Sequence, residues 1–269
     1  MSNRDNKAFT LIELLVVIAI IALLMSILMP ALNRVRDQAK TMMCRARLRE
    51  WGLLFKFYTD DYNGSFNPGW DKNQETTLWM NALRPYYKDN WEMLLCPTAT
   101  RLMLDSTDFG TFKAASRSIN TPGGGEYTYI FSYGINSWTN NMTADRNARK
   151  VEWFWKNVNN IQRADTIPVF ADSTWHDGWP LDTDVPSEAM DAFGIGDQGT
   201  TGEMDHFCIN RHDGFINSLF MDWSTRRVGL RELWTLKWHR EFNTAGVWTK
   251  AGGATDADWP AWLRNFPAY

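Results

Sequence analysis

An apolar run near the start of the sequence is long enough to cross a membrane. Only three side chains are polar in residues 9–32, namely Thr10, Glu13 and Ser26. As a helix, this run extends over about 30 Å or more. A carboxylate at the centre of such a segment costs roughly 2.5–3.5 kcal/mol, and less near its end. Glu13 is therefore a candidate functional residue, and the alternative is a carboxylate that sits at the level of the lipid headgroups.

The leader before this run is short and polar, and it ends abruptly at Ala8. A secretory signal peptide is cut after its apolar core, behind small residues, and Ser26-Ile27-Leu28 is a poor substitute for such a site. Cleavage before Phe9 would instead keep the apolar helix and create an amino terminus four residues before Glu13. The ammonium group and the carboxylate, both costly in lipid, would then neutralise each other within or between subunits.

The segment from Lys7 to Glu13, with the apolar run and Pro30 behind it, resembles the cleavage and methylation segment of type IV prepilins and type II secretion pseudopilins. The resemblance implies that a membrane-embedded aspartic peptidase cuts between Ala8 and Phe9 and then methylates Phe9. It also implies that Glu13 guides docking of subunits into a helical filament. Ala8 departs from the family, which usually has Gly at this position.

The same resemblance implies partners and a location. The partners are other copies of the chain, a prepilin peptidase, an inner-membrane assembly platform and membrane lipid. The location is a bacterial inner membrane, crossed once with the head in the periplasm, and later a periplasmic or extracellular filament. Nucleic acid is not an expected partner, because the charge is +4 over residues 1–50 and −7 over residues 51–269. The acidic bulk repels phosphate, whereas the basic stem suits anionic headgroups.

A helical pattern continues beyond the apolar run. Apolar residues recur at three- and four-residue spacing in residues 32–54, with arginines mostly between them. A helix from Phe9 to Asp60 would be about 78 Å long, so its second half must pack against the head or, alternatively, form a coiled-coil seam. Pro30 allows a kink at the lipid boundary, where it would serve assembly. Asn63-Gly64 is expected to end the helix.

The fold implied by the resemblance is α+β and type IV pilin-like. Its long amino-terminal helix, transmembrane in the first half, packs on an antiparallel β-sheet head with long loops. We therefore expect four parts: a leader at 1–8, a transmembrane and assembly helix at 9–32, its amphipathic continuation at 33–62, and a globular head at 63–269.

Local patterns predict the elements of the head. Helical turns are expected over Trp79–Tyr87, strands at 94–97, 127–134 and 166–172, and a long loop at 173–205. A hairpin should pair residues 206–211 with 215–222 through a turn at His212-Asp213-Gly214, and a helix is expected over 230–238.

A second resemblance lies in the carboxy-terminal half. Nine residues separate His212 from Asp222, as in bacterial pseudopilin-like proteins named for a His-x9-Asp-Gly motif, although Trp223 stands where that group has Gly. If the two residues bracket one strand, they lie roughly 33 Å apart at about 3.3 Å per residue. They would then each anchor a turn, and they are not expected to form a catalytic pair.

Three cysteines, Cys44, Cys96 and Cys208, lack the spacing of a metal site. Outside the cytoplasm two of them can pair. The surroundings of Cys44 and Cys96, which resemble the same pseudopilin-like group, favour a disulfide between these two. Three ordinary buried thiols are the alternative.

Enzyme signatures are weak in this chain. Gly194-Ile195-Gly196-Asp197-Gln198-Gly199 matches a dinucleotide-binding fingerprint, but no buried strand precedes it and no helix is predicted after it. The sequence therefore predicts a protein that is not an enzyme. A metal-dependent hydrolase using His176, His206 or His212 is the weakest of the functional alternatives.

Two compositional features leave further alternatives open. Acidic residues in the loop at 182–205 supply oxygen atoms of the kind that bind Ca²⁺, as in major pseudopilins, although a solvated acidic loop is the simpler explanation. All fifteen tryptophans follow residue 50, and residues 175–179 are the first choice for an exposed aromatic cluster. An alternative function is thus a membrane-tethered carbohydrate-binding protein.

Overall fold

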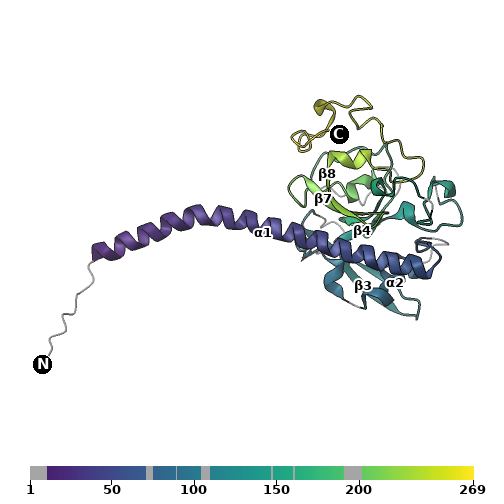
Figure 1. The fold of residues 1–269 in the computed structure, drawn as a ribbon, viewed down its shortest axis with the longest axis horizontal. Coiled ribbons are helices and arrows are strands. Elements are labelled where there is room, and N and C mark those ends of the chain that lie inside the picture. Colours follow the sequence, from purple (N-terminus) through teal and green to yellow (C-terminus); the bar gives the residue numbers. More distant parts are fainter. Residues whose placement is uncertain are drawn as a thin grey trace. The chain divides into compact units, whose positions relative to one another are not determined.

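The computed structural model describes residues 11–269 except 71–74, 89, 104–109, 147, 160 and 191–201. The chain divides into two compact units, residues 1–40 and residues 41–269. The long helix α1, Leu11–Asp61, belongs to both of them (Figure 1). We describe each unit by itself.

Helix α1 is continuous through Pro30 and ends where the sequence predicts. The backbone takes the left-handed conformation at Asn63 and Gly64, with φ of 53° and 82°. The amide of Gly64 donates to the carbonyl of Thr59, which satisfies one of the last free carbonyl groups of the helix. The predicted helix end is therefore confirmed, and the predicted start at Phe9 lies outside the described residues.

In residues 41–61, one face of α1 is buried in the head. Its buried residues recur every three or four positions: Cys44, Leu48, Trp51, Gly52, Phe55, Tyr58 and Thr59. The Trp51 and Phe55 rings lie 5.1 and 5.5 Å from the ring of Phe170. At Gly52 a Cβ atom would lie 2.9 Å from Cδ1 of Leu219, so the absence of a side chain lets the helix approach closely.

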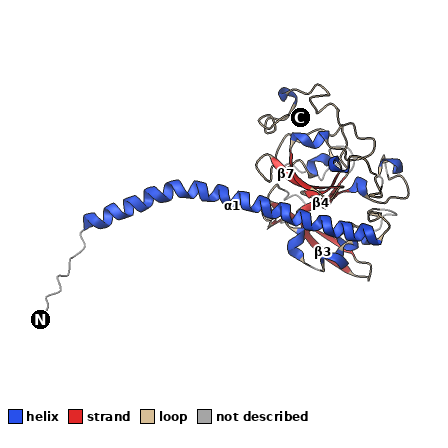
Figure 2. Cartoon of the chain, in the orientation of Figure 1, coloured by secondary structure: helices blue, strands red, loops and turns tan. Residues whose placement is uncertain are grey.

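The larger sheet of the head has five strands in the order β6-β4-β5-β7-β8. The strands are β4 Tyr133–Asn136, β5 Pro168–Asp172, β6 Asp177–Gly178, β7 Phe215–Phe220 and β8 Thr225–Gly229. Neighbours pair antiparallel, except that the short β6 runs parallel to β4. Because Phe170 lies in β5 and Leu219 in β7, helix α1 packs on the middle strands of this sheet (Figure 2).

A smaller sheet has three strands, β1 Arg101–Leu102, β2 Lys113–Asn120 and β3 Glu126–Phe131. Strands β2 and β3 pair antiparallel, and β1 runs parallel to β2. The α+β prediction is thus confirmed, with two short parallel pairings in a head that was expected to be antiparallel.

Short helices connect these strands. The α-helical turns are α2 Trp79–Ala82 and α3 Arg84–Tyr87. The 3-10 helices are η2 Glu75–Thr77, η3 Trp91–Leu94, η4 Ser137–Thr139, η5 Val151–Trp153, η6 Ala164–Thr166, η7 Glu203–His206, η8 Arg231–Thr235 and η9 Asp256–Asp258.

Several local predictions are confirmed and others are wrong. Helical turns cover Trp79–Tyr87, and a strand covers Pro168–Asp172. The predicted strand at 127–134 is divided at Ser132 into β3 and β4. Residues 94–97 form no strand, because a 3-10 turn ends there. The predicted helix at 230–238 is the short 3-10 helix η8.

The predicted hairpin is also wrong. Strand β7 pairs with β8, and residues 206–211 are not a strand. The connecting turn contains Trp223 with φ of 65°, a conformation that glycine adopts far more easily than a residue with a side chain. The real turn therefore lacks the usual glycine signal, whereas Asp213-Gly214 supplies that signal at a turn outside the hairpin.

The tryptophans form core rather than a surface cluster. Trp91 is the most exposed of them at 37%, and the other fourteen are half-buried or buried. The expected exposed cluster at 175–179 is wrong, since Trp175 is half-buried and Trp179 is 6% exposed. The Arg149 guanidinium covers the Trp179 ring at 3.9 Å from its centroid, which is a cation–π contact.

Candidate functional site

The amino-terminal stem is apolar and has no protein cover. Every described residue from 11 to 40 is exposed. The large apolar side chains between Leu11 and Val35 that are exposed have exposed fractions of 46% to 78%. By length and composition, helix α1 is able to cross a membrane. Because contiguous apolar surface of this size is rare on a soluble monomer, another apolar medium must cover it.

The predicted processing residues fall near the start of this stem. Ala8 and Phe9 lie outside the described residues. Glu13 lies in the first turn of α1 and is exposed. Its carboxylate is therefore presented to whatever surrounds the apolar helix.

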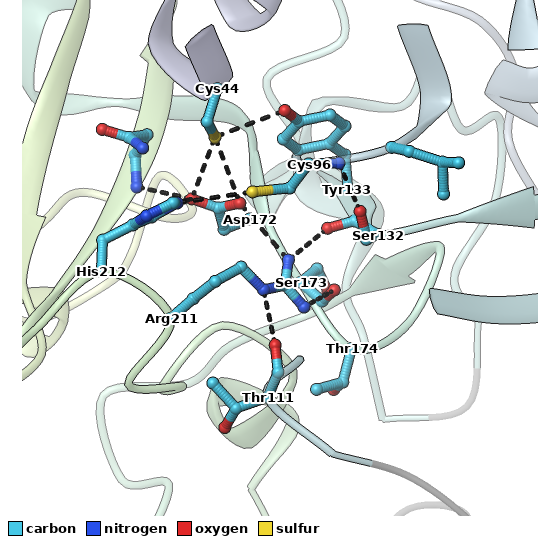
Figure 3. A network of polar contacts seen from close by, with 12 residues as sticks. Cys44, Cys96, Thr111, Ser132, Tyr133, Asp172, Ser173, Thr174, Arg211 and His212 are labelled. Atoms are coloured by element: carbon cyan, nitrogen blue, oxygen red, sulfur yellow. Dashed lines mark hydrogen bonds and ion pairs between the residues drawn. The ribbon is translucent and has the colours of Figure 1, made fainter. Parts of the chain in front are cut away.

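A second candidate site is a buried polar centre in the head. Cys44 comes from α1, Cys96 from the segment after η3, Asp172 from the end of β5, and His212 from the turn before β7. All four residues are buried, and one ligand atom from each lies within 4.8 Å of the others. Figure 3 shows these side chains pointing toward one another.

The carboxylate of Asp172 is the most connected group in this centre. Its Oδ2 accepts from the amide of Asn217 at 2.8 Å and lies 3.1 Å from Nε2 of His212. Its Oδ1 lies 3.3 Å from Nη1 of Arg211. Burial alone would raise the pKa of Asp172, but His212, Arg211 and the Asn217 amide together hold it well below its usual range. The carboxylate is therefore ionised in the folded head.

Arg211 connects this centre to the surrounding backbone. Its Nε donates to the carbonyl of Thr111 at 2.7 Å, and Nη2 donates to the carbonyl of Ser173 at 2.9 Å. Nη1 donates to the carbonyl of Ser132 as well as to Asp172. A buried guanidinium with this many acceptors is fully compensated, so removal of one partner would leave a costly charge.

His212 and the two thiols complete the centre. Nδ1 of His212 lies 3.1 Å from Oγ1 of Thr41, and Nε2 lies 3.5 Å from Sγ of Cys96. Sγ of Cys44 lies 3.4 Å from Oδ1 of Asp172 and accepts from the hydroxyl of Tyr133 at 3.3 Å. Burial lowers the pKa of His212, but Asp172 more than offsets this and raises it. Burial raises the pKa of the Cys44 thiol well above its ordinary value.

The structure separates the two residues of the His-x9-Asp pattern. His212 belongs to the buried centre, whereas Asp222 is exposed in the turn after β7. Oδ1 of Asp222 accepts from the amide of Ser224 at 2.9 Å. Their positions before and after β7 mean that the two side chains do not meet.

Sequence reasoning identified part of this centre. It named His212 and favoured pairing Cys44 with Cys96, and the structure brings all three together with the cysteines as free thiols. It missed Asp172 and Arg211. The available signal was a carboxylate that ends an otherwise apolar strand, since such a residue is buried only when it has partners.

The histidines considered for a hydrolase lie in two different places. His212 belongs to the buried centre, whereas His176 and His206 surround Asp177. Nε2 of His176 accepts from Arg117 at 2.8 Å, and its Nδ1 lies 3.0 Å from Oδ1 of Asp177. Nδ1 of His206 lies 2.6 Å from the carbonyl of Asp177. Burial lowers the pKa of His176 and outweighs the opposing effect of Asp177.

Several carboxylates of the acidic loop bond within the protein. Oδ2 of Asp184 accepts from the amides of Leu181 and Met204, both at 3.0 Å. Glu203 pairs with Arg149, and Asp205 accepts from the backbone of the same loop. Burial raises the pKa of Asp184 to about 7 and that of Asp205 to about 6.

The calcium and dinucleotide predictions fall partly or wholly outside the described residues. Asp191 and Asp197 of the acidic loop lie there, as does the fingerprint at 194–199. Within the residues that are described, one group of at least three candidate metal ligands is found, and it is the centre of Cys44, Cys96, Asp172 and His212.

Comparison with known families bears on the first site. Residues 3–29 match the model of the prokaryotic N-terminal methylation motif. The chain therefore carries a prepilin-type amino-terminal segment, followed by the apolar helix that this class of protein requires. These two features are those of an amino-terminal segment that is processed from a prepilin-type precursor. No curated protein and no solved structure matched the chain.

Proposed function

We propose that this protein is a structural subunit that assembles through its amino-terminal helix into a pilus or a type II secretion pseudopilus. The observation that carries this proposal is a helix whose described residues are all exposed from 11 to 40 and mostly apolar up to residue 32. Burial of one Leu, Ile or Val side chain is worth about 1.5–3 kcal/mol. A stem with this many such side chains is stable in lipid before assembly and among the helices of other copies afterwards.

Processing would prepare the stem for assembly. A prepilin peptidase would remove residues 1–8 and leave Phe9 as the amino terminus, which is then methylated. Glu13 would pair with the amino group of a neighbouring subunit, because each charge is costly in an apolar surrounding without the other. The match to the methylation motif over residues 3–29 supports this role.

The same proposal places the protein in a bacterial inner membrane, crossed once with the head in the periplasm. Arg34, Arg36 and Lys40 follow the apolar run and are exposed. Their charges suit the anionic headgroups at a lipid boundary. Pro30 falls near that boundary and would let the helix adapt during the transfer from lipid to filament. An assembly platform in the same membrane would then accept the mature subunit.

The amino terminus of the mature protein tests the processing step. The full chain is co-expressed with a prepilin peptidase, and its amino-terminal peptide is identified by mass spectrometry. We expect N-methylphenylalanine at Phe9, whereas an intact Met1 in membranes would contradict the proposal. Ala8→Leu should block cleavage because the peptidase needs a small residue there. Ala31→Leu, at the far end of the apolar run, is the matched control that should leave cleavage unchanged.

A carbohydrate-binding function keeps one supporting observation. The Trp91 and Tyr127 rings stack with centroids 5.1 Å apart and an interplanar angle of 7°, and Trp91 is exposed. The guanidinium of Arg84 lies 4.5 Å from the Tyr127 centroid and 6.0 Å from the Trp91 centroid, so the ring that would meet a sugar is the exposed Trp91. Retention of the protein on insoluble polysaccharide, and its loss in Trp91→Ala, would support this second function. If the protein is not retained on polysaccharide, the carbohydrate-binding function is excluded and the filament subunit is the remaining proposal.

A further inference from the structure

The buried centre of the head combines four side chains of the types that bind transition metals. Two thiols, one imidazole and one carboxylate converge from Cys44, Cys96, His212 and Asp172. Thiolate and imidazole ligands in a closed tetrahedral set are typical of structural zinc. We propose that this centre binds one Zn²⁺ through Sγ of Cys44, Sγ of Cys96, Nε2 of His212 and Oδ2 of Asp172.

Three of the six distances between these atoms fit a tetrahedral zinc site, and all six are within 4.8 Å. Bond lengths of about 2.0–2.3 Å from zinc to oxygen, nitrogen and sulfur place the ligand atoms about 3.3–3.8 Å from one another. Nε2 of His212 lies 3.1 Å from Oδ2 of Asp172 and 3.5 Å from Sγ of Cys96. Sγ of Cys44 lies 3.5 Å from Oδ2 of Asp172. Three edges of the tetrahedron are therefore present to within about 0.2 Å.

The groups around the centre orient its ligands. Nδ1 of His212 lies 3.1 Å from Oγ1 of Thr41, and a proton on Nδ1 leaves the lone pair of Nε2 directed into the centre. Oδ2 of Asp172 accepts from the amide of Asn217, and its Oδ1 contacts Arg211. Partners of this kind fix the tautomer of a metal-binding histidine and the orientation of a carboxylate.

The charges of the occupied centre balance. Zinc binding releases the two thiol protons and the Nε2 proton of His212 to solvent, so the imidazole binds as a neutral ligand and the two thiolates neutralise the dication. The negative charge of Asp172 is matched by the buried guanidinium of Arg211, which it contacts at 3.3 Å. A buried site with no net charge avoids the desolvation cost that an unmatched ion would carry.

The site would be structural rather than catalytic. It has four protein ligands, all of them buried, whereas a catalytic zinc keeps one position for water or substrate. Cys44 is the first buried residue of α1 along the chain. Zinc would therefore join the start of the buried part of α1 to strand β5, to the segment after η3 and to the turn before β7.

Metal analysis of the full-length chain tests the proposal. The chain is purified in detergent with a tag that does not bind metal, after expression with zinc in the medium, and its metals and its thiols after denaturation are counted. We expect one zinc per chain and three free thiols. Absence of zinc, or a disulfide between Cys44 and Cys96 with only one remaining thiol, would overturn the proposal.

Cobalt provides a test that needs no variant. Replacement of zinc by Co²⁺ should give the intense visible bands of tetrahedral cobalt and a near-ultraviolet band from sulfur-to-cobalt charge transfer. Weak bands typical of six-coordinate cobalt would exclude the proposed ligand set.

Substitutions then assign the ligands. Cys44→Ser and His212→Gln should each lose the bound metal, whereas Cys208→Ser, at a buried cysteine outside the centre, should keep it. Thr41→Val removes the hydroxyl beside Nδ1 of His212 and keeps all four ligands, and we expect a 10–100-fold weaker zinc affinity by chelator competition. Equal zinc content in wild type and Cys44→Ser would contradict the assignment, as would unchanged affinity in Thr41→Val.

Discussion

Nε2 of His212 lies 3.1 Å from Oδ2 of Asp172 in a part of the head that is closed to solvent. This pair joins the turn before β7 to the end of β5, and Arg211 and the amide of Asn217 complete the hydrogen bonding of the carboxylate. The ionised carboxylate of Asp172 explains why His212, in a short polar turn, is buried in the core. The following predictions test this centre and other parts of the protein.

Removal of the Asp172 carboxylate should destabilise the head strongly. Asp172→Ala leaves the buried guanidinium of Arg211 without its counter-charge, and breaking a buried pair in this way costs about 3–5 kcal/mol. Urea denaturation of the full chain in detergent, followed by circular dichroism, measures the loss. Asp222→Ala is the control, because Asp222 is exposed and bonds to the turn amide of Ser224, and its cost should stay below about 1 kcal/mol. Equal losses of unfolding free energy in Asp172→Ala and Asp222→Ala would contradict the prediction that the buried carboxylate stabilises the head.

Gly134→Ala should also be destabilising. A Cβ atom at Gly134 would lie 2.5 Å from the carbonyl oxygen of Trp175 and 2.8 Å from Oγ of Ser173. Because the first of these atoms belongs to the backbone, relief requires a shift of the chain, and such overpacking costs about 1–3 kcal/mol. Gly123→Ala is the matched control, since a Cβ there has no atom within 4 Å. The same denaturation measurement should separate them, and a stable Gly134→Ala would argue against the close approach.

The stability of the head should fall in mild acid because of His239. Burial, aided by nearby Lys237, lowers the pKa of His239 to about 4, below the ordinary value of about 6.5. The folded state then binds the proton more weakly than the unfolded state does. The contribution is therefore complete above about pH 6.5, and about 3 kcal/mol is lost as the pH falls toward 4.

His239→Phe should flatten this pH dependence. The histidine ring stacks on Trp153 with centroids 5.1 Å apart, and phenylalanine preserves that contact without a titrating group. Denaturation midpoints of wild type and variant are compared between pH 4 and pH 7. A variant that loses as much stability as wild type over this range would remove His239 as the cause.

Filament assembly should depend on the carboxylate of Glu13 and not on other acidic residues of the same helix. Glu13→Ala should leave membrane insertion intact, because the apolar run is unchanged, and reduce filament yield. Even a subunit contact weakened by about 1.4 kcal/mol lowers association about tenfold. Glu50→Ala, at an exposed position of the same helix, is the control. Filament yield is measured by shearing and sedimentation, and an unchanged yield for Glu13→Ala would remove the role proposed for its carboxylate.

Strong local signals made the stem and several elements of the head predictable. A long apolar run predicts a helix, because a helix satisfies all of its backbone hydrogen bonds within one segment. Asn63-Gly64 ended α1 because both residues take the left-handed conformation. The β7–β8 hairpin was missed because its turn places Trp223 in that conformation, where a sequence pattern looks for glycine. The Trp223 ring packs against Phe66 with centroids 6.4 Å apart, a tertiary contact that no local sequence pattern records.

The buried centre was only partly predictable because its residues are far apart in the sequence. Cys44, Cys96, Asp172 and His212 belong to four separate segments, and no spacing rule connects them. The tryptophans were misjudged for a related reason. Composition gives the number of aromatic side chains but not their burial. Only the packing of the folded head shows that Trp138, Trp234 and Trp238 are fully buried.

The positions of the tryptophans have a practical consequence for fluorescence measurements on this protein. All fifteen lie beyond residue 50 and none is more than 37% exposed, so the tryptophan fluorescence of the protein comes entirely from the head. Unfolding of the head would move that emission to longer wavelength, whereas polymerisation through the stem would leave its colour unchanged. Light scattering and fluorescence recorded on one sample would thus follow polymerisation and unfolding as two independent signals.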